Sequence, residues 1–424
     1  MEAKNTGIEG VALTRRQAIA AGGAAAATAA LGGMAATALA DEGGTEELTW
    51  DLECDVVVCG CGTGGVAAAV SAADGGAEVI VIEKKDWCGG QLRRCGGGVA
   101  AAGSQVQKKL GVEDNADAFY DYWMAMQENL CDADLVRHIC DASAGIIDWL
   151  IDDLGGQPLD EWGFSAGIEG GLEYSGEPGL NIGTQPENFE SVGMEPVARC
   201  HWFSPNADDP IIGEADKVVC PNPGGTGLYK IFTNAFERLG IEPMTKTALV
   251  RLVTKPGSNE VLGVVADQDG TEIRIKARKG VVVATGNFCS NHEMFFNYTM
   301  HDFVTSDDIN GNGPGIDLID DNDGSGIKAV LALGGELVYP CNGVFENPDG
   351  TSFGYSFMTG GMRVDSQARA LDVFGNPIPR LYLTSNTSGG QIIKSYHCCG
   401  VNVLRFFYLG KTAGEQLNAL ESWE

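Results

Sequence analysis

The clearest hydrophobic pattern of the chain lies at residues 55–82, where two apolar runs flank a segment of small residues. Residues 55–59 (DVVVC) are typical of a parallel strand that is buried on both faces. A glycine-rich turn at 60–65 (GCGTGG) follows, and the alanine-rich stretch 66–73 predicts a helix. A second apolar run at 78–82 predicts a neighbouring strand, so the segment reads as a strand–helix–strand unit.

The glycine turn carries the spacing of a dinucleotide-binding site. Gly60 would allow a tight turn, Gly62 would let the backbone approach a pyrophosphate, and Gly65 would let the helix pack closely on the strand. Glu83 ends the second strand, about where such folds place the acid that binds ribose hydroxyls. The glycine pattern alone is a weak signal, but its position between strand and helix and the acid after the second strand make it a strong one.

Two further glycine clusters bear on which dinucleotide binds. They lie at 88–91 (CGGQ) and 95–98 (CGGG), shortly after the first turn. The longer flavin arm of FAD needs more backbone contacts than NAD does. The clusters therefore favour FAD.

Helices and strands follow in the rest of the chain. Helices are predicted at 116–130 and 133–154, the second with an apolar face, and at 224–239. Strands are predicted at 248–253, 261–267 and 281–283. Residues 155–223 are rich in Gly, Pro, Asn and acids, which indicates a substrate lid or a partner surface.

Charge excludes one class of partner. The chain has 28 Lys and Arg against 58 Asp and Glu, a net charge of −30. No basic surface is available to neutralise phosphates, so nucleic-acid binding is not expected.

Residues 1–40 predict a twin-arginine export signal rather than a part of the fold. Arg15 and Arg16 precede a weakly apolar stretch that ends in ALA at 38–40, a small-residue cleavage site. The alternative is a chance pair of arginines before an alanine-rich helix. The signal predicts export by this Tat route to the periplasm or the extracytoplasmic cell surface.

The 13 cysteines favour buried thiols over a disulfide framework, because the number is odd and several lie in strand or turn contexts. No haem-attachment or ferredoxin-type run of cysteines occurs. The histidines and cysteines lack the paired spacing of zinc sites, so we expect no metal.

Together these motifs resemble those of the FAD-dependent fumarate reductase and 3-ketosteroid dehydrogenase superfamily. The shared features include the first turn, the glycine clusters, Ala284-Thr285-Gly286 and the strand at 377–382. The resemblance implies an α/β fold: a Rossmann-like FAD-binding domain built from discontinuous segments, with a reduced capping domain. The implied organisation is a Tat signal peptide at 1–40, FAD-binding segments at 41–112, 224–298 and 356–424, a helical and loop-rich insertion or lid at 113–223, and a reduced cap at 299–355.

The resemblance also implies the residues that contact FAD. One departure is the segment 383–386 (LTSN), which stands where the family has a flavin-contacting A-A-G-E. The residues expected at the cofactor are Gly60, Gly62, Thr63, Gly64, Gly65, Glu83, Lys84, Gly89, Gly90, Gln91, Gly97, Ala248, Ala284, Thr285, Gly286, Asn386, Gly400, Val401, Asn402 and Val403.

The catalytic residues of fumarate reductases are missing from the matching positions, where Phe357 replaces a histidine and the arginine motifs are absent. Residues 396–400 are similar instead to the Y-P-x-x-G loop of ketosteroid dehydrogenases. By that resemblance, the Tyr396 hydroxyl and the Gly400 amide would polarise a substrate carbonyl. The alternative is that Tyr396 packs beside the flavin. The proton donor stays open, with His397, Tyr382 and Arg363 as candidates.

These observations predict an exported FAD-dependent oxidoreductase that reduces an activated C=C bond of a small enone or enoate. Electrons would come from a separate cytochrome or quinol-linked partner, through which alone the protein would associate with a membrane. Two alternatives remain at this stage: a dehydrogenase of a ketosteroid-like substrate, and a catalytically degenerate flavoprotein that transfers electrons.

Overall fold

A computed structural model describes residues 49–95, 97–156, 180–183, 186–203, 224–288, 290–298, 322–346, 352–393 and 399–423. The predicted signal peptide, most of the predicted lid and much of the predicted cap lie outside these residues. The domain boundaries therefore stay a prediction.

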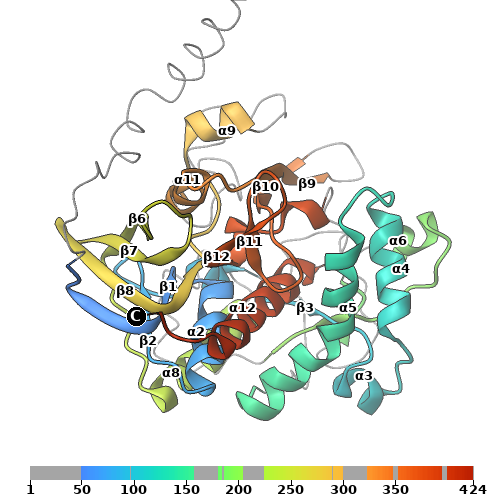
Figure 1. The fold of residues 1–424 in the computed structure, drawn as a ribbon. Coiled ribbons are helices and arrows are strands. Elements are labelled where there is room, and N and C mark those ends of the chain that lie inside the picture. Colours follow the sequence, from blue (N-terminus) through green and yellow to red (C-terminus); the bar gives the residue numbers. More distant parts are fainter. Residues whose placement is uncertain are drawn as a thin grey trace, which may run out of the picture. The chain divides into compact units, whose positions relative to one another are not determined.

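The described residues contain a seven-stranded sheet at the centre of the fold (Figure 1). Its strands run in the order β11-β12-β8-β1-β2, and β8 continues into an antiparallel meander with β7 and β6. Three separate parts of the chain supply them, as the fold class requires. The bounds are β1 Leu52–Cys59, β2 Val79–Ile82, β6 Thr247–Thr254, β7 Val261–Gln268, β8 Thr271–Val283, β11 Arg369–Leu371 and β12 Pro377–Leu383.

Four of these strands are parallel and end at one edge of the sheet. Cys59 at the end of β1 is level with Ile82 of β2 and with Val283 of β8, and Leu383 of β12 is level with Val283. Ligands of open parallel sheets bind outside this carboxyl edge. The register therefore brings the turns after the four strands together.

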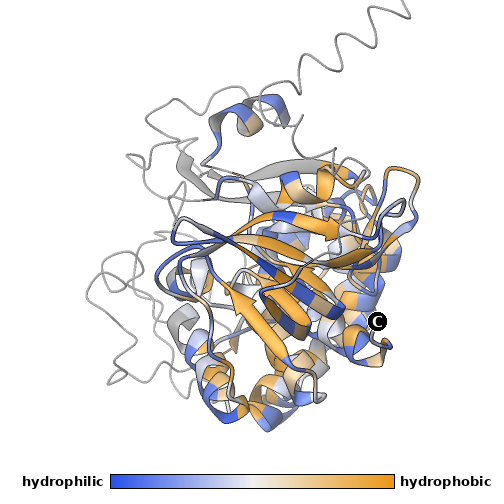
Figure 2. Ribbon diagram, turned by 60° about the vertical axis from the view of Figure 1, so that its left-hand side comes forward, coloured by the Kyte–Doolittle hydropathy of each residue, from blue (hydrophilic) through white to orange (hydrophobic). Residues whose placement is uncertain are grey.

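The parallel strands form where the sequence is apolar without alternation. Val56, Val57 and Val58 of β1 are fully buried, as are Val281 and Val282 of β8. Long hydrophobic stretches are visible in several sheet strands (Figure 2). The prediction of a mixed α/β fold with a buried parallel sheet is confirmed.

Helices α2 (Thr63–Asp74) and α12 (Val401–Ala419) pack against each other closely enough to require glycine. A Cβ atom on Gly410 would lie 2.3 Å from the carbonyl oxygen of Gly64, and one on Gly414 would lie 2.7 Å from the amide of Ala72. The last helix of the chain is thus fixed against the first glycine turn.

The predicted helices at 116–130 and 133–154 are present with changed ends. The first, α4, ends at Met126, and Glu128 and Asn129 follow it with positive φ angles of 54° and 55°. The second, α5, gives way after Asp148 to one wider π-helical turn, η3. Its predicted apolar face is buried. The elements of this region are β3 Val99–Ala100, α3 Gln105–Leu110, α4 Ala116–Met126, α5 Ala133–Asp148, η3 Trp149–Asp153, β4 Leu180–Asn181, α6 Pro186–Ser191 and β5 Cys200–His201.

The remaining elements connect the sheet segments. None of the described helices is long and apolar enough to cross a membrane. Their bounds are η2 Gly90–Arg94, α8 Gly224–Leu239, α9 His292–Tyr298, α11 Ser325–Leu331, β9 Leu337–Glu346, β10 Ser352–Met362, η4 Ser385–Thr387 and η5 Gly390–Ile392.

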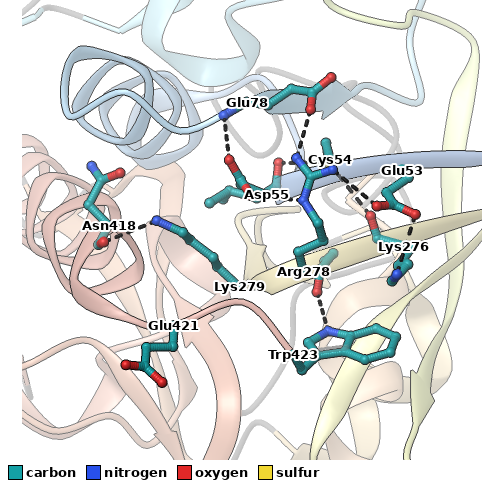
Figure 3. Close-up of polar contacts among 12 residues, drawn as sticks. Glu53, Cys54, Asp55, Glu78, Lys276, Arg278, Lys279, Asn418, Glu421 and Trp423 are labelled. Carbon is teal, nitrogen blue, oxygen red and sulfur yellow. Dashed lines mark hydrogen bonds and ion pairs between the residues drawn. The ribbon is translucent and has the colours of Figure 1, made fainter.

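An ion-pair network links β8 to β1 and to the start of β2 at the amino-terminal edge of the parallel strands. Arg278 of β8 donates to Glu53 at 3.1 Å, to Asp55 at 2.9 Å and to Glu78 at 2.7 Å (Figure 3). Burial alone would raise the pKa of Asp55, but the hydrogen bonds from Arg278 and the Glu78 amide and the nearby positive charges together lower it. The amide of Trp423 donates to the carbonyl oxygen of Arg278 at 2.9 Å, which holds the segment after α12 against β8.

Candidate functional site

A pocket lies at the carboxyl edge of the parallel strands, where the register brings the turns together. Its wall is built from the ends of β1, β2 and β8 and from the segments after β12 and at α11. Eleven of the residues predicted to bind the cofactor line it: Gly60, Gly62, Thr63, Glu83, Lys84, Gly90, Gln91, Ala284, Thr285, Gly286 and Asn386.

Three of the four glycines of the first turn differ in what surrounds them. Gly60 has a φ of 103°, and a Cβ there would lie 2.5 Å from the carbonyl oxygen of Ala284. A Cβ on Gly65 would lie 1.9 Å from the carbonyl oxygen of Gly60. A Cβ on Gly62 would meet nothing within 4 Å, because this residue faces the open pocket. Gly60 and Gly65 are therefore required by packing, whereas Gly62 leaves space for a ligand.

The amino terminus of α2 opens on this pocket. Gly62 is its N-cap and has no side chain to accept from the first amides. The Gly64 amide donates to Ser385 Oγ at 3.0 Å, and the Thr63 amide has no acceptor among the described residues. Amides at a helix amino terminus favour negative groups, so a phosphate group fits here.

Glu83 contacts the first glycine turn and is held by backbone amides. Its Oε2 accepts from the Cys61 amide at 2.8 Å and its Oε1 accepts from the Lys85 amide at 2.9 Å. Burial raises the pKa of Glu83, and the hydrogen bonds from Lys85 and Cys61 oppose that rise. The fixed carboxylate in the pocket wall suits the donor hydroxyls of a ribose.

The glycine cluster at 88–91 contacts the first glycine turn. Gly89 has a φ of 107°, and its amide donates to the Cys61 carbonyl oxygen at 2.7 Å. This contact places Gly90 and Gln91, at the start of η2, in the pocket wall.

The turn after β8 forms another part of the pocket wall. The Ala284 amide donates to the Cys59 carbonyl oxygen at 2.8 Å, and Gly286 follows with a φ of 84°. Thr285 Oγ1 is buried and has no hydrogen-bond partner among the residues that the structure describes. A buried hydroxyl without a partner is costly, so this orphan, the open space at Gly62 and the anchored Glu83 together fit a dinucleotide.

Nine predicted residues do not line the pocket: Gly64, Gly65, Gly89, Gly97, Ala248, Gly400, Val401, Asn402 and Val403. Gly65, for example, packs against the backbone of Gly60, which itself lines the pocket. Thr247 and Leu249 line the pocket on either side of Ala248, because side chains alternate along a strand. Contacts through the backbone of these residues stay a prediction.

Several other residues of the wall were not among those expected at the cofactor. They include Lys85, Trp87, Asn322, Asp323, Ser385 and Phe406. Lys84 donates to Asp323 at 2.9 Å, which joins the end of β2 to the start of α11. Thr247 and Leu249 could have been found from the alternation beside Ala248, and Ser385 from its place in the 383–386 segment.

Gly400 has a geometry that only glycine tolerates. It is the N-cap of α12 with a φ of 88°, and a Cβ would lie 2.5 Å from the amide of Ala100. That amide donates to the Gly400 carbonyl oxygen at 3.2 Å. The Gly400 amide has no acceptor among the residues described.

The other predicted catalytic residues are not brought together in the described part of the chain. Tyr396 and His397 lie outside the described residues. Tyr382 is buried in β12, and Arg363 forms an ion pair with Glu336 at 3.0 Å. Neither Tyr382 nor Arg363 lines the pocket.

Comparisons with known proteins agree with this geometry. A family model described as an FAD-binding domain matches residues 55–337. A digoxin reductase of Eggerthella lenta is 29% identical over 72% of this chain and 49% of its own length. An acrylate reductase flavoprotein subunit of Shewanella woodyi is 26% identical over 89% of this chain and 71% of its own length. The chain thus spans about half of the first relative.

Solved structures share the fold. A 3-ketosteroid-Δ4-(5α)-dehydrogenase from Rhodococcus jostii RHA1 superposes with a TM-score of 0.71 at 22% identity, covering 89% of this chain and 99% of the other. A flavocytochrome c3 fumarate reductase in an open conformation gives a TM-score of 0.64 at 17% identity, covering 87% and 78%. The predicted resemblance is confirmed, and the chain belongs to the FAD-binding domain family with FAD as its cofactor.

Proposed function

We propose that this protein is an exported FAD-dependent oxidoreductase that reduces the C=C bond of an enone or an enoate. The observation that carries the proposal is the similarity to an acrylate reductase flavoprotein subunit along 89% of the chain. Acrylate is an unsaturated carboxylate, and fumarate, named for another relative, is one as well.

When bound, FAD supplies a hydride from N5 to one carbon of the double bond. The other carbon takes a proton from an acid of the protein, and the activating carbonyl or carboxylate needs hydrogen-bond donors as charge develops on its oxygen. The Gly400 amide is one such donor, since no described group accepts from it and β3 holds the residue in place. Tyr396 would supply the second donor, four residues earlier in the chain.

We propose a cytochrome or quinol-linked partner as the source of electrons. Two relatives are named fumarate reductase (cytochrome), which is compatible with such a donor. Export rests on the twin arginines Arg15 and Arg16.

Anaerobic reoxidation of the flavin tests the function. The protein would be loaded with FAD, reduced with a viologen, and mixed with acrylate, cinnamate, fumarate, urocanate or an enone steroid while flavin absorbance is followed. We expect reoxidation by at least one activated double bond and none by the saturated analogues propionate and succinate.

The result that contradicts the proposal is equally specific. If a chemical oxidant such as ferricyanide reoxidises the flavin but no enone or enoate does, the protein is an electron-transfer flavoprotein. If the saturated compounds reduce the oxidised flavin and the unsaturated ones do not react, it is a dehydrogenase.

A further inference from the structure

Arg405 is a fully buried cation one turn inside α12. Its Nε donates to Asn402 Oδ1 at 2.9 Å, and its Nη1 donates to the carbonyl oxygens of Ser388 at 3.2 Å and Gly389 at 2.7 Å. Its Nη2 donates to Asn386 Oδ1 at 3.0 Å. The guanidinium also lies over the Phe406 ring, 4.5 Å from its centre.

All of these partners are uncharged. Arg405 forms no ion pair with any carboxylate in the described part of the chain. The contrast with Arg278, which has three carboxylate partners, is clear (Figure 3). Burial lowers the pKa of Arg405 to about 9, so the side chain stays protonated at neutral pH. A buried charge without a counter-ion is unfavourable unless something else supplies the opposite charge.

The cation lies directly behind the wall of the cofactor pocket. Asn386 and Phe406 both line the pocket, and both contact the guanidinium. Ser385, next to Asn386, accepts from the Gly64 amide at the amino terminus of α2. Asn386 therefore lies beside the helix end where the phosphates of a dinucleotide fit.

The hydrogen bond from Arg405 also decides how Asn386 is oriented. A guanidinium can only donate, so the carboxamide oxygen must face it. The Asn386 Nδ2 atom is turned away from Arg405 and has no acceptor among the described residues. The Asn386 Nδ2 atom can therefore donate a hydrogen bond to a ligand in the pocket.

We propose that Arg405 is a positioning residue for the FAD pyrophosphate. It supplies the positive charge that the phosphates neutralise, and it turns the Asn386 amide toward them. The inference concerns cofactor binding and does not depend on the substrate or on the direction of the reaction.

Binding of three probes to the deflavinated full-length protein tests this role. FAD and ADP carry the pyrophosphate, whereas adenosine carries only the ribose and the base. We expect Arg405→Gln to weaken FAD and ADP by at least about tenfold, as for loss of a buried charge partner, and to leave adenosine unchanged. Arg405→Lys keeps the charge and should recover most of the ADP affinity.

Arg278→Gln is the matched control, because it removes a cation at the opposite edge of the parallel strands. It should leave the affinity for all three probes unchanged. Circular dichroism and thermal unfolding would show that each variant is folded. The proposal is overturned if Arg405→Gln binds ADP as the native protein does, or if the lysine variant is as weak as the glutamine variant.

A second variant covers the case in which Arg405→Gln does not fold. Asn386→Ala leaves Arg405 with its three other hydrogen bonds and removes the amide from the pocket wall. It should weaken ADP by several-fold without affecting adenosine. Unchanged ADP binding by this variant would also overturn the proposal.

Discussion

The hydroxyl oxygen of Ser385 accepts a hydrogen bond from the amide of Gly64 at 3.0 Å, although the two residues are 321 positions apart. Ser385 adopts a left-handed backbone conformation with a φ of 58°, which is unfavourable for a residue other than glycine. The tertiary structure maintains it because the hydroxyl satisfies a buried amide at the start of α2.

Replacing Ser385 should therefore separate backbone strain from hydrogen bonding. Ser385→Ala keeps the strained backbone and leaves the Gly64 amide without an acceptor, which should cost about 1–3 kcal/mol of unfolding free energy. Ser385→Gly loses the same hydrogen bond but relieves the strain, so it should cost less. Urea unfolding measures both. Ser258→Ala, in the exposed turn between β6 and β7, is the control. Equal losses for Ala and Gly at position 385 would contradict this account.

The glycines of the first turn should respond differently to alanine. The Cβ atom of Gly62→Ala would meet no atom within 4 Å, so the unfolding free energy should fall by less than about 1 kcal/mol. FAD affinity should fall at least about tenfold, because the methyl group occupies the space of the ligand. Gly65→Ala would place a Cβ 1.9 Å from a carbonyl oxygen and should destabilise the fold by about 1–3 kcal/mol or more. Thermal unfolding and FAD titration distinguish the two. Tight FAD binding by Gly62→Ala would refute the role of this glycine.

Glu83 should give the apoprotein a component of stability that depends on pH. Its pKa is raised by burial, so the folded state holds the proton more tightly than the unfolded state does. This contribution is present below the ordinary glutamate pKa and is lost as pH rises through the folded value. Comparing unfolding free energies of the native protein and Glu83→Gln from pH 4 to pH 7 isolates it.

The expected difference has a definite sign. Relative to the glutamine variant, the native apoprotein should lose stability as the pH rises. An opposite trend would show that the hydrogen bonds from Cys61 and Lys85 dominate over burial. The glutamine variant should also bind adenosine more weakly, since the ribose acceptor is altered.

Tyr396→Phe tests the predicted donor to the substrate carbonyl. Removing one such donor typically lowers kcat by about 100- to 1000-fold, and we expect a loss of that order with FAD content unchanged. Tyr298→Phe, at a half-exposed ring on α9, is the control. A native rate for Tyr396→Phe would mean that Tyr396 only packs beside the flavin.

The export proposal depends on Arg15 and Arg16. Replacing both with lysine preserves the charge and removes the guanidinium pair, so the precursor should accumulate inside the cell with residues 1–40 attached. Fractionation and mass spectrometry of the amino terminus measure this. Export of the double variant at the native rate would contradict the twin-arginine route.

Local physical rules were sufficient to predict the first strand–turn–helix–strand unit. The unbroken apolar run of β1, the glycines of the turn and the acid after β2 are all within one short stretch, and each follows from backbone sterics or from the spacing along the chain. The fold class and the cofactor could be inferred from that stretch and from the later glycine clusters. The positions of Gly60, Gly62 and Glu83 in one pocket agree with the inference.

The rest of the pocket wall depends on tertiary structure. Asn386 was expected at the cofactor only through a family motif that it does not match, and Ser385, Asp323 and Phe406 were not among the residues expected there. Arg405 is an ordinary helical arginine in the sequence, and its buried, uncompensated charge exists only because α12 packs against α2 and the 385–389 segment wraps around it. Short-range sterics and periodicity control the strands, the helices and the glycine turn, so these could be predicted from the amino-acid order. Which distant polar groups share a low-dielectric wall depends on contacts between residues hundreds of positions apart, which appear only in the folded chain.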